Sequence, residues 1–112
     1  MNTSNNNEKQ VYSLLGLCQK AGYIKAGEFQ TEKTVKSGLA FLLIVANDSS
    51  DNTKKKFKNM AAFYETPYFE FGEKDALGKC IGCEFRASLA VTNEGLAKKI
   101  ISKIQNNIQN TK

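Results

Sequence analysis

One stretch of the chain, from Lys25 to Lys33, reads Lys-Ala-Gly-Glu-Phe-Gln-Thr-Glu-Lys and combines groups that could hold an anion. Gly27 stands where an extended pattern gives way to a helical one, and the free amides of a helix's first turn attract phosphate. Lys25, Lys33 and Lys36 add positive charge. Gln30 can both donate and accept hydrogen bonds, which suits a base edge. From spacing alone, a turn glycine among solvated lysines explains this stretch better than a ligand site.

A second basic stretch, residues 54–58, reads Lys-Lys-Lys-Phe-Lys. Consecutive lysines on a helix point around it instead of along one face. We therefore expect a solvated surface whose secondary use is a diffuse attraction to RNA. The carboxylates are scattered, and no pair has sequence neighbours that would make one an acid and the other a base.

Cys80 and Cys83 have the spacing of redox dithiols and of half a zinc site. Zinc needs four ligands, and only Cys18 remains in a chain that has no histidine. Redox dithiols usually open a helix, where the amides favour the thiolate, whereas this pair stands at the end of a helical pattern. We expect both thiols to serve packing, and we expect no metal, no cofactor and no catalysis.

The composition excludes further classes of protein. The 112 residues fit a single domain. The net charge is +5, and every cation except Arg86 is a lysine, so an anionic partner is expected. Without histidine there is no Ser-His or Cys-His nucleophile pair.

The longest apolar run, residues 39–46, is too short for a bilayer, which needs about 20 residues. Residues 1–10 are polar and lack the pattern of a secretory signal. An odd number of cysteines fits free thiols in a reducing compartment. We expect a cytoplasmic protein that makes no membrane contact.

The hydrophobic pattern alternates between helical and extended segments. The predicted helices cover 8–21, 27–37, 51–64, 73–81 and a last segment capped by Asn93, and the predicted strands cover 23–26, 39–46, 68–71 and 86–92. The run 39–46 has no alternation, as in a central strand covered on both faces. Helices interleaved with strands favour an α/β fold, a three-layer α/β/α sandwich with a central mixed sheet of about four strands.

One domain is expected over 8–105, with residues 1–7 and 106–112 as flexible tails, because both ends are polar and lack periodicity. Ser50 or Asp51 is the expected cap of the third helix. Its predicted buried face consists of Phe57, Met60, Ala61 and Tyr64. That of the last helix consists of Ala97, Ile100, Ile101, Ile104 and Ile108.

Several of these segments, taken in order, are similar to those of a known family. They are Leu14–Gly22, Ala26-Gly27-Glu28 with the helix ending at Lys36-Ser37-Gly38, Leu43–Ser50, Asn52–Lys56, Leu77–Lys79 and Ala90–Gly95. Their order and spacing resemble the bacterial, YlxQ-type branch of the kink-turn-binding large-subunit ribosomal proteins. The resemblance extends from Glu8 to about Ile104.

The resemblance implies a non-enzymatic RNA-binding sandwich that recognises kink-turns, which are sharply bent internal loops built on tandem sheared G·A pairs. In the family, the helix that opens at Gly27 touches the guanines of those pairs. A second contact region corresponds to residues 83–87, whose apolar side chains would lie against a flipped-out nucleotide. We expect a monomer associated with the ribosome or another ribonucleoprotein. The expected RNA-binding residues are Lys25, Gly27, Glu28, Phe29, Gln30, Lys33, Lys36, Cys83, Glu84, Phe85, Arg86 and Ala87.

The sequence departs from the family pattern Gly-x-Asn-Glu-x-x-Lys, which Gly27 and Lys33 match and Gln30 matches only by analogy. Phe29 takes the Asn position, and a phenyl ring cannot hydrogen-bond a base. The ring either stacks on a base or packs beneath the helix, and packing is the expectation. One alternative function is a protein-interaction module of the same fold with weak or lost RNA specificity. A remote third is a small thiol enzyme using Cys80 and Cys83.

Overall fold

The structure is a computed structural model, which describes the backbone of residues 3–110 and the side chains of residues 7–106. Helices and strands alternate along the described chain as the pattern predicts. They are α1 (Thr3–Lys20), β1 (Ile24–Ala26), α2 (Glu28–Lys36), β2 (Leu42–Val45), α3 (Asp51–Tyr64), β3 (Tyr68–Glu70), α4 (Lys74–Cys80), β4 (Ser88–Val91) and α5 (Glu94–Asn110).

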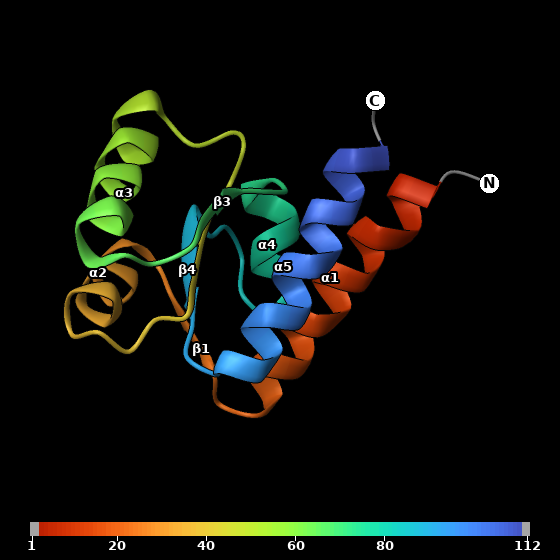
Figure 1. Ribbon diagram of the computed structural model, residues 1–112, viewed down its shortest axis with the longest axis horizontal. Helices are drawn as coiled ribbons and strands as arrows, with labels where there is room; N and C mark the ends of the chain where they lie inside the picture. The colour runs from red at the N-terminus through yellow and green to blue at the C-terminus, as the bar shows by residue number, and fades with distance from the viewer. Residues whose placement is uncertain (1–2, 111–112) are drawn as a thin grey trace.

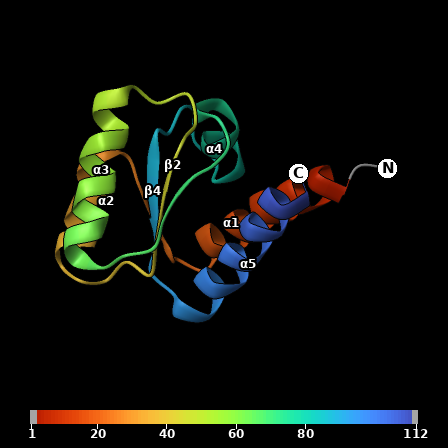
Figure 2. The ribbon, with the colours of Figure 1, turned by 45° about the horizontal axis from the view of Figure 1, so that its top comes forward.

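The strands form one mixed sheet in the order β1-β4-β2-β3. β4 runs antiparallel to both β1 and β2, whereas β3 runs parallel to β2. Every residue of β2 and β4 is buried, which fits their central places. Helices α2 and α3 cover one face of the sheet, and α1, α4 and α5 cover the other (Figures 1 and 2). The predicted α/β/α sandwich is confirmed.

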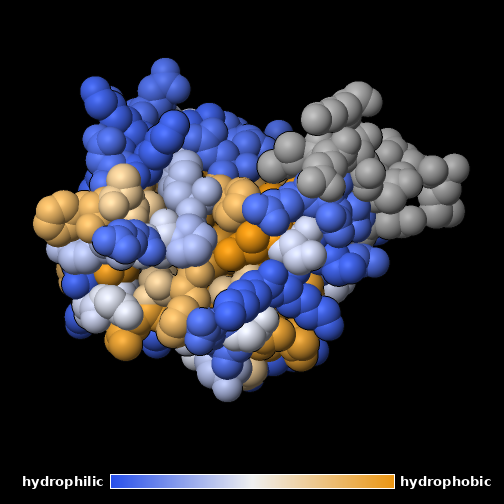
Figure 3. Space-filling model, in the orientation of Figure 1, coloured by the Kyte–Doolittle hydropathy of each residue, from blue (hydrophilic) through white to orange (hydrophobic). Residues whose placement is uncertain are grey.

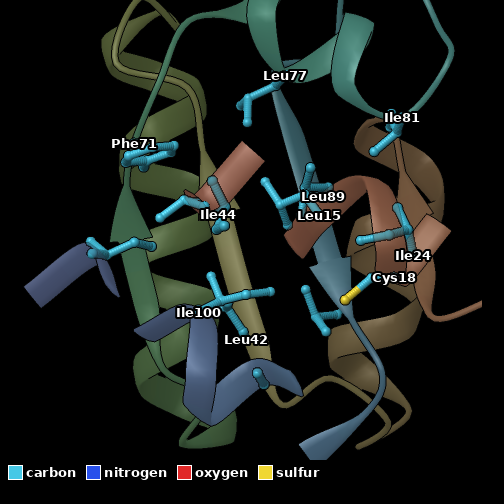
Figure 4. Close-up of a cluster of buried hydrophobic side chains, with 14 of the residues drawn as sticks. Leu15, Cys18, Ile24, Leu42, Ile44, Phe71, Leu77, Ile81, Leu89 and Ile100 are labelled. Carbon is cyan, nitrogen blue, oxygen red and sulfur yellow. The ribbon is translucent and has the colours of Figure 1, made fainter. Parts of the chain in front are cut away.

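Alternate residues of β2 belong to two separate hydrophobic cores, because successive side chains of a strand point to opposite faces of the sheet. Leu42 and Ile44 join the larger core beneath α1, α4 and α5, with residues such as Leu15 and Leu89 (Figure 4). The smaller core lies beneath α2 and α3 and contains Val35, Leu43, Val45, Phe57 and Ala61. Each valine, leucine, isoleucine or phenylalanine side chain of these cores contributes about 1.5–3 kcal/mol when fully buried. The apolar run lacks alternation because both faces of β2 are covered.

The predicted caps are confirmed at two helices. The amide of Thr53 donates to the Ser50 hydroxyl oxygen at 3.1 Å at the start of α3. The amide of Leu96 donates to Oδ1 of Asn93 at 2.9 Å before α5. These caps fix where both helices begin, at the ends of the connections from β2 and β4.

Helices α1 and α5 extend further than predicted, since Thr3–Asn7 and Asn106–Asn110 are helical. The two helices lie side by side along most of their length (Figures 1 and 2), and this packing supports polar turns that local pattern does not favour. The flexibility of the ends stays a prediction. Met1, Asn2, Thr111 and Lys112, and the side chain of Ile108, lie outside what the structure describes.

Three local predictions are wrong. Leu39 and Phe41 precede β2 instead of belonging to it: the amide of Leu39 closes the turn that ends α2 by donating to the Thr34 carbonyl, and the Phe41 amide makes a single hydrogen bond to the Val91 carbonyl just before the strand begins. Tyr64 is 39% exposed because α3 ends there, beyond the edge of the smaller core. β4 begins at Ser88 because the amide of Arg86 donates to the Lys74 carbonyl of α4 and not to a strand.

No helix within residues 3–110 is long and apolar enough to span a membrane. In the same part of the chain, no three acidic or cysteine side chains gather in a way that could hold a metal ion.

Candidate functional site

The junction of β1 and α2 has a backbone conformation that requires glycine. Gly27 has φ 91° and ψ 157°, a region in which side chains are strained even though open space surrounds the position of a Cβ atom. Its amide donates to the Ser88 carbonyl at 3.0 Å, and its carbonyl accepts from the Thr31 amide at 2.9 Å. No side chain caps this end of α2. The first-turn amides, at the positive end of the helix dipole, are therefore free for a ligand.

The outer face of α2 carries polar and aromatic side chains. Thr31 and Val35 are buried, so the opposite face presents Phe29, Gln30 and Lys33 to solvent. Phe29 is 72% exposed, so the prediction that it packs beneath the helix is wrong. The buried face of α2 is formed by Thr31, Thr34 and Val35, and Phe29 lies outside this face.

Two further predicted cations lie apart from each other. Lys25 is exposed on β1, next to Gly27 in the fold as in the sequence. Lys36 lies in the last turn of α2, about 12 Å along the axis from Glu28. It forms an ion pair with Glu32 at 2.7 Å. The structure therefore brings Lys25 to the glycine junction and leaves Lys36 away from it.

A lysine of α3 joins α2 through ion pairs. The Lys56 ammonium lies 2.9 Å from Glu28 and 2.8 Å from Glu32. Hydrogen bonds from Lys36 and Lys56 lower the pKa of Glu32 to about 2, and the same contacts with Glu32 and Glu28 raise the pKa of Lys56. These pairs neutralise both carboxylates near the start of α2. The prediction of a merely solvated Lys56 is wrong, because its carboxylate partners are far away in the chain and no local pattern reveals them.

The connection 83–87 lies directly on α4. A Cβ atom at Gly78 would overlap the carbonyl oxygen of Glu84, so only glycine admits this approach. The Cys83 amide donates to the Gly78 carbonyl at 2.8 Å, and the Arg86 amide donates to the Lys74 carbonyl at 3.1 Å. The backbone is thus fixed while the Phe85 ring stays 64% exposed.

The glycine junction and this connection meet at one end of the sheet. Ser88, which follows the connection, accepts the hydrogen bond from Gly27, and its own hydroxyl is buried without a hydrogen-bond partner in the described structure. The Ala87 carbonyl accepts from the Ala46 amide at 2.8 Å and from the Ser49 hydroxyl at 3.3 Å. The β2–α3 connection, residues 47–50, is therefore a third component.

We call this end of the sheet, formed by residues 25–33, 47–50 and 83–87, the junction surface. Residues 47–50 are not among the site residues predicted from the sequence. The position of this segment directly after a buried strand could have indicated a functional role, because connections at strand ends commonly carry functional residues. The surface combines free amides, exposed rings and lysines, which can bind phosphate and stack on bases.

The cysteines pack as predicted. Cys80 and Cys83 are half-buried against the larger core, and all three cysteines are free thiols. The Cys80 thiol donates to the Leu77 carbonyl at 3.1 Å, and burial raises its pKa to about 11. A reactive dithiol needs the opposite shift, so this environment does not favour thiol chemistry.

Comparison with known proteins defines the class. The family model described as Ribosomal protein L7Ae/L30e/S12e/Gadd45 family matches residues 9–101, and the chain belongs to this family. The predicted YlxQ-type branch is confirmed by similarity to two proteins described as RNA-binding protein YlxQ. The chain is 36% identical to that of Bacillus subtilis strain 168 over 91 residues, which are 81% of this chain and 91% of the relative. It is 36% identical to that of Enterococcus faecium over 93 residues, 83% and 89% of the two chains.

Solved structures agree in fold. A protein of unknown function from Bacillus halodurans C superposes with a TM-score of 0.82 at 33% identity, covering 85% of this chain and 96% of that one. The Giardia lamblia 15.5kD RNA binding protein superposes with a TM-score of 0.76 at 21% identity, covering 91% of this chain and 90% of the other. At that identity, the second similarity concerns the fold alone.

Proposed function

We propose that this chain is a non-enzymatic RNA-binding protein that recognises kink-turn-like RNA with the junction surface. The family match and the two relatives described as RNA-binding proteins support the RNA part of the proposal. A cytoplasmic ribosome or ribonucleoprotein would supply such an RNA. The net charge of +5 favours association with any of these polyanions.

The observation that carries the proposal is the uncapped, glycine-led start of α2 beside a rigidly held connection. Free amides and Lys33 suit phosphate, while the Gln30 amide suits a base edge. The exposed rings of Phe29 and Phe85 offer two faces on which unstacked bases can lie. A sharply bent internal loop presents a widened groove and an unstacked base together, which matches this arrangement.

Within the predicted set, the proposed roles differ. Gly27 gives close backbone access, and the Glu28 carboxylate is neutralised by Lys56 so that it does not repel phosphate. Residues 83–87 position Phe85 against the RNA. Lys36 contributes only to the general positive field, since it lies at the far end of α2.

Two substitutions test the proposal. Gln30→Ala should weaken binding to a kink-turn RNA by ~1–3 kcal/mol if Gln30 reads a base, and Lys33→Ala should cost less if it contacts phosphate. Both side chains are exposed, so the fold should not change. Gln105→Ala and Lys99→Ala on α5 are matched controls, and we expect wild-type affinity for both. Equal affinity of all four variants, measured by gel shift, would reject the junction surface as the RNA site.

One observation favours the alternative of a protein-interaction module that has lost tight RNA specificity. Phe29 replaces the family's Asn and is 72% exposed, so the ring could contact a protein instead of a base. Pull-down from cell extract with and without nuclease separates the two functions. Partners that vanish with nuclease support RNA binding, and partners that persist and depend on Phe29 support the module.

A further inference from the structure

The end of the molecule opposite the junction surface contains a groove. There α2 and α3 end and α5 begins, in the lower part of the view in Figure 2. The groove has a volume of about 320 Å³. Its apolar lining comes from the segment before β2, the end of α3 and one side of α5, and consists of Ala40, Phe41, Tyr64, Pro67, Ala97 and Ile101.

Large apolar side chains are unusually exposed around this groove. Seven large hydrophobic side chains are exposed among the described residues, and four of them lie at the groove end of the molecule. They are Leu39, Phe41, Phe63 and Tyr64, with exposed fractions of 60%, 40%, 79% and 39%. Figure 3 shows hydrophobic residues gathered across the middle and lower part of this face, between α3 and α5. Contiguous exposed apolar surface of this kind marks an interaction site.

The charge of the groove is opposite to that of the whole chain. Glu65 and Glu94 line it, and the one lining cation, Lys98, already lies 3.5 Å from Glu94. The carboxyl ends of α2 and α3 converge here and add partial negative charge, which the amino end of α5 only partly offsets. Two glutamates and one lysine give the described lining a net side-chain charge of −1, whereas the protein carries +5 overall, so the groove is a slightly acidic, apolar patch on a basic molecule.

We propose that this groove binds a short segment of another protein that presents an aliphatic or aromatic side chain next to a lysine or arginine. The apolar side chain fills the groove, and the cation lies against Glu65 and Glu94. The volume is at the lower limit of ligand sites, about 300–1,000 Å³, and suits one or two side chains.

The same features argue against other occupants. RNA phosphates would meet the Glu65 carboxylate, the Glu94–Lys98 ion pair and the carboxyl ends of two helices. In a symmetric pair of copies, the acidic groove would face itself, because a twofold interface uses the same patch on both subunits. The junction surface lies at the other end of the sheet, so RNA and the peptide segment bind without competing.

Selection of short random peptides displayed on phage, with the full chain immobilised, tests the proposal. The selected peptides should combine an aromatic or aliphatic residue with a neighbouring lysine or arginine. Synthetic copies should bind Tyr64→Ser and Glu65→Lys about tenfold or more weakly than wild type, a loss of about 1.4 kcal/mol or more. Glu65→Gln should fall between wild type and Glu65→Lys.

Leu17→Ser removes an apolar side chain of similar exposure from α1 and is the matched control. This variant should bind the peptides like wild type. Kink-turn RNA should bind Tyr64→Ser and Glu65→Lys as it binds wild type, so this test succeeds or fails independently of the proposed function.

Three results would overturn the proposal. The first is that the phage selection gives no peptides, or gives acidic ones. The second is that the groove variants and the control bind the peptides with equal affinity. The third is that sedimentation velocity shows a wild-type dimer and that Tyr64→Ser dissociates this dimer. The last result would assign the groove to a second copy of the chain. Circular dichroism of each variant checks that the fold is retained, which we expect because both altered side chains are exposed.

Discussion

At the residue scale, Lys56 determines the charge that an RNA would meet beside α2. Its ammonium pairs with Glu28 and Glu32 at 2.9 and 2.8 Å, and together with Lys36 it lowers the pKa of Glu32 to about 2. The folded pKa of Glu32 lies below its ordinary value of 4.5, so the stabilisation is present above that value and is lost as pH falls toward 2. At neutral pH the pairs are fully formed.

Lys56→Gln should therefore weaken kink-turn RNA binding, because it removes one cation and leaves the Glu28 carboxylate without its ion pair near phosphate, while Glu32 keeps its ion pair with Lys36. We expect a loss of about 3- to 10-fold at low salt, smaller at high salt, in a gel-shift titration. Lys55→Gln is the matched control, since Lys55 is exposed and makes no ion pair in the described structure. Equal losses in both variants would mean that only net charge matters and that the pairing has no role.

A second residue-scale prediction concerns Cys80, whose burial raises its pKa from 9.0 to about 11. The folded protein holds the proton more tightly than the unfolded chain, so this contribution to stability is present below pH 9 and is lost as pH rises toward 11. Urea unfolding of wild type should show a loss of stability between pH 9 and 10.5 that is smaller in Cys80→Ala. A wild-type alkylation rate at Cys80 that is already maximal at pH 8 would contradict the buried, protonated thiol.

At the element scale, the position of residues 83–87 depends on α4. Both hydrogen bonds from this connection to α4 and the close approach at Gly78 keep Phe85 at the junction surface. The sequence suggested this connection only through the family resemblance, because no local pattern reveals which helix a loop will contact.

Gly78→Ala should displace residues 83–87, because the new methyl group would overlap the Glu84 carbonyl. We expect destabilisation of about 1–3 kcal/mol and weaker RNA binding. Gly95→Ala in α5 is the matched control, since its methyl group would lie 3.6 Å from Asn93, an ordinary contact, and alanine favours helix by up to ~1 kcal/mol. Thermal unfolding and gel shifts of both variants provide the measurement, and wild-type behaviour of Gly78→Ala would contradict the described packing.

Local patterns predicted most elements but not their ends. The apolar stripe of Val11, Leu14, Leu15 and Cys18 predicted α1, and all of these residues except the partly buried Leu14 are buried. The unbroken run 39–46 predicted a strand covered on both faces, and its buried part is 42–46. The polar turns at Thr3–Asn7 could not be predicted, because these residues have no apolar periodicity that would indicate a helix. Similarly, Gly27 was identifiable as a junction from sequence, whereas the pairing of Lys56 with Glu28 depends on the contact between α2 and α3.

At the scale of the whole molecule, the sheet separates two surfaces of different chemistry. Free amides, lysines and two exposed rings lie at one end, where β1 and β2 finish. The acidic groove lies at the other end, where α2 and α3 finish. A basic protein of this design can hold RNA at one end and a protein segment at the other. The monomeric state that the sequence suggested stays a prediction.

The most direct test of the central claim compares one RNA with its disrupted form by calorimetric titration. The first RNA contains a kink-turn, and the second replaces its sheared G·A pairs with Watson–Crick pairs. We predict saturable binding of the first, with log affinity falling linearly as log salt rises, and binding of the second weaker by at least about 3 kcal/mol. Equal affinity for both RNAs, or no binding to either at low salt, would contradict specific kink-turn recognition.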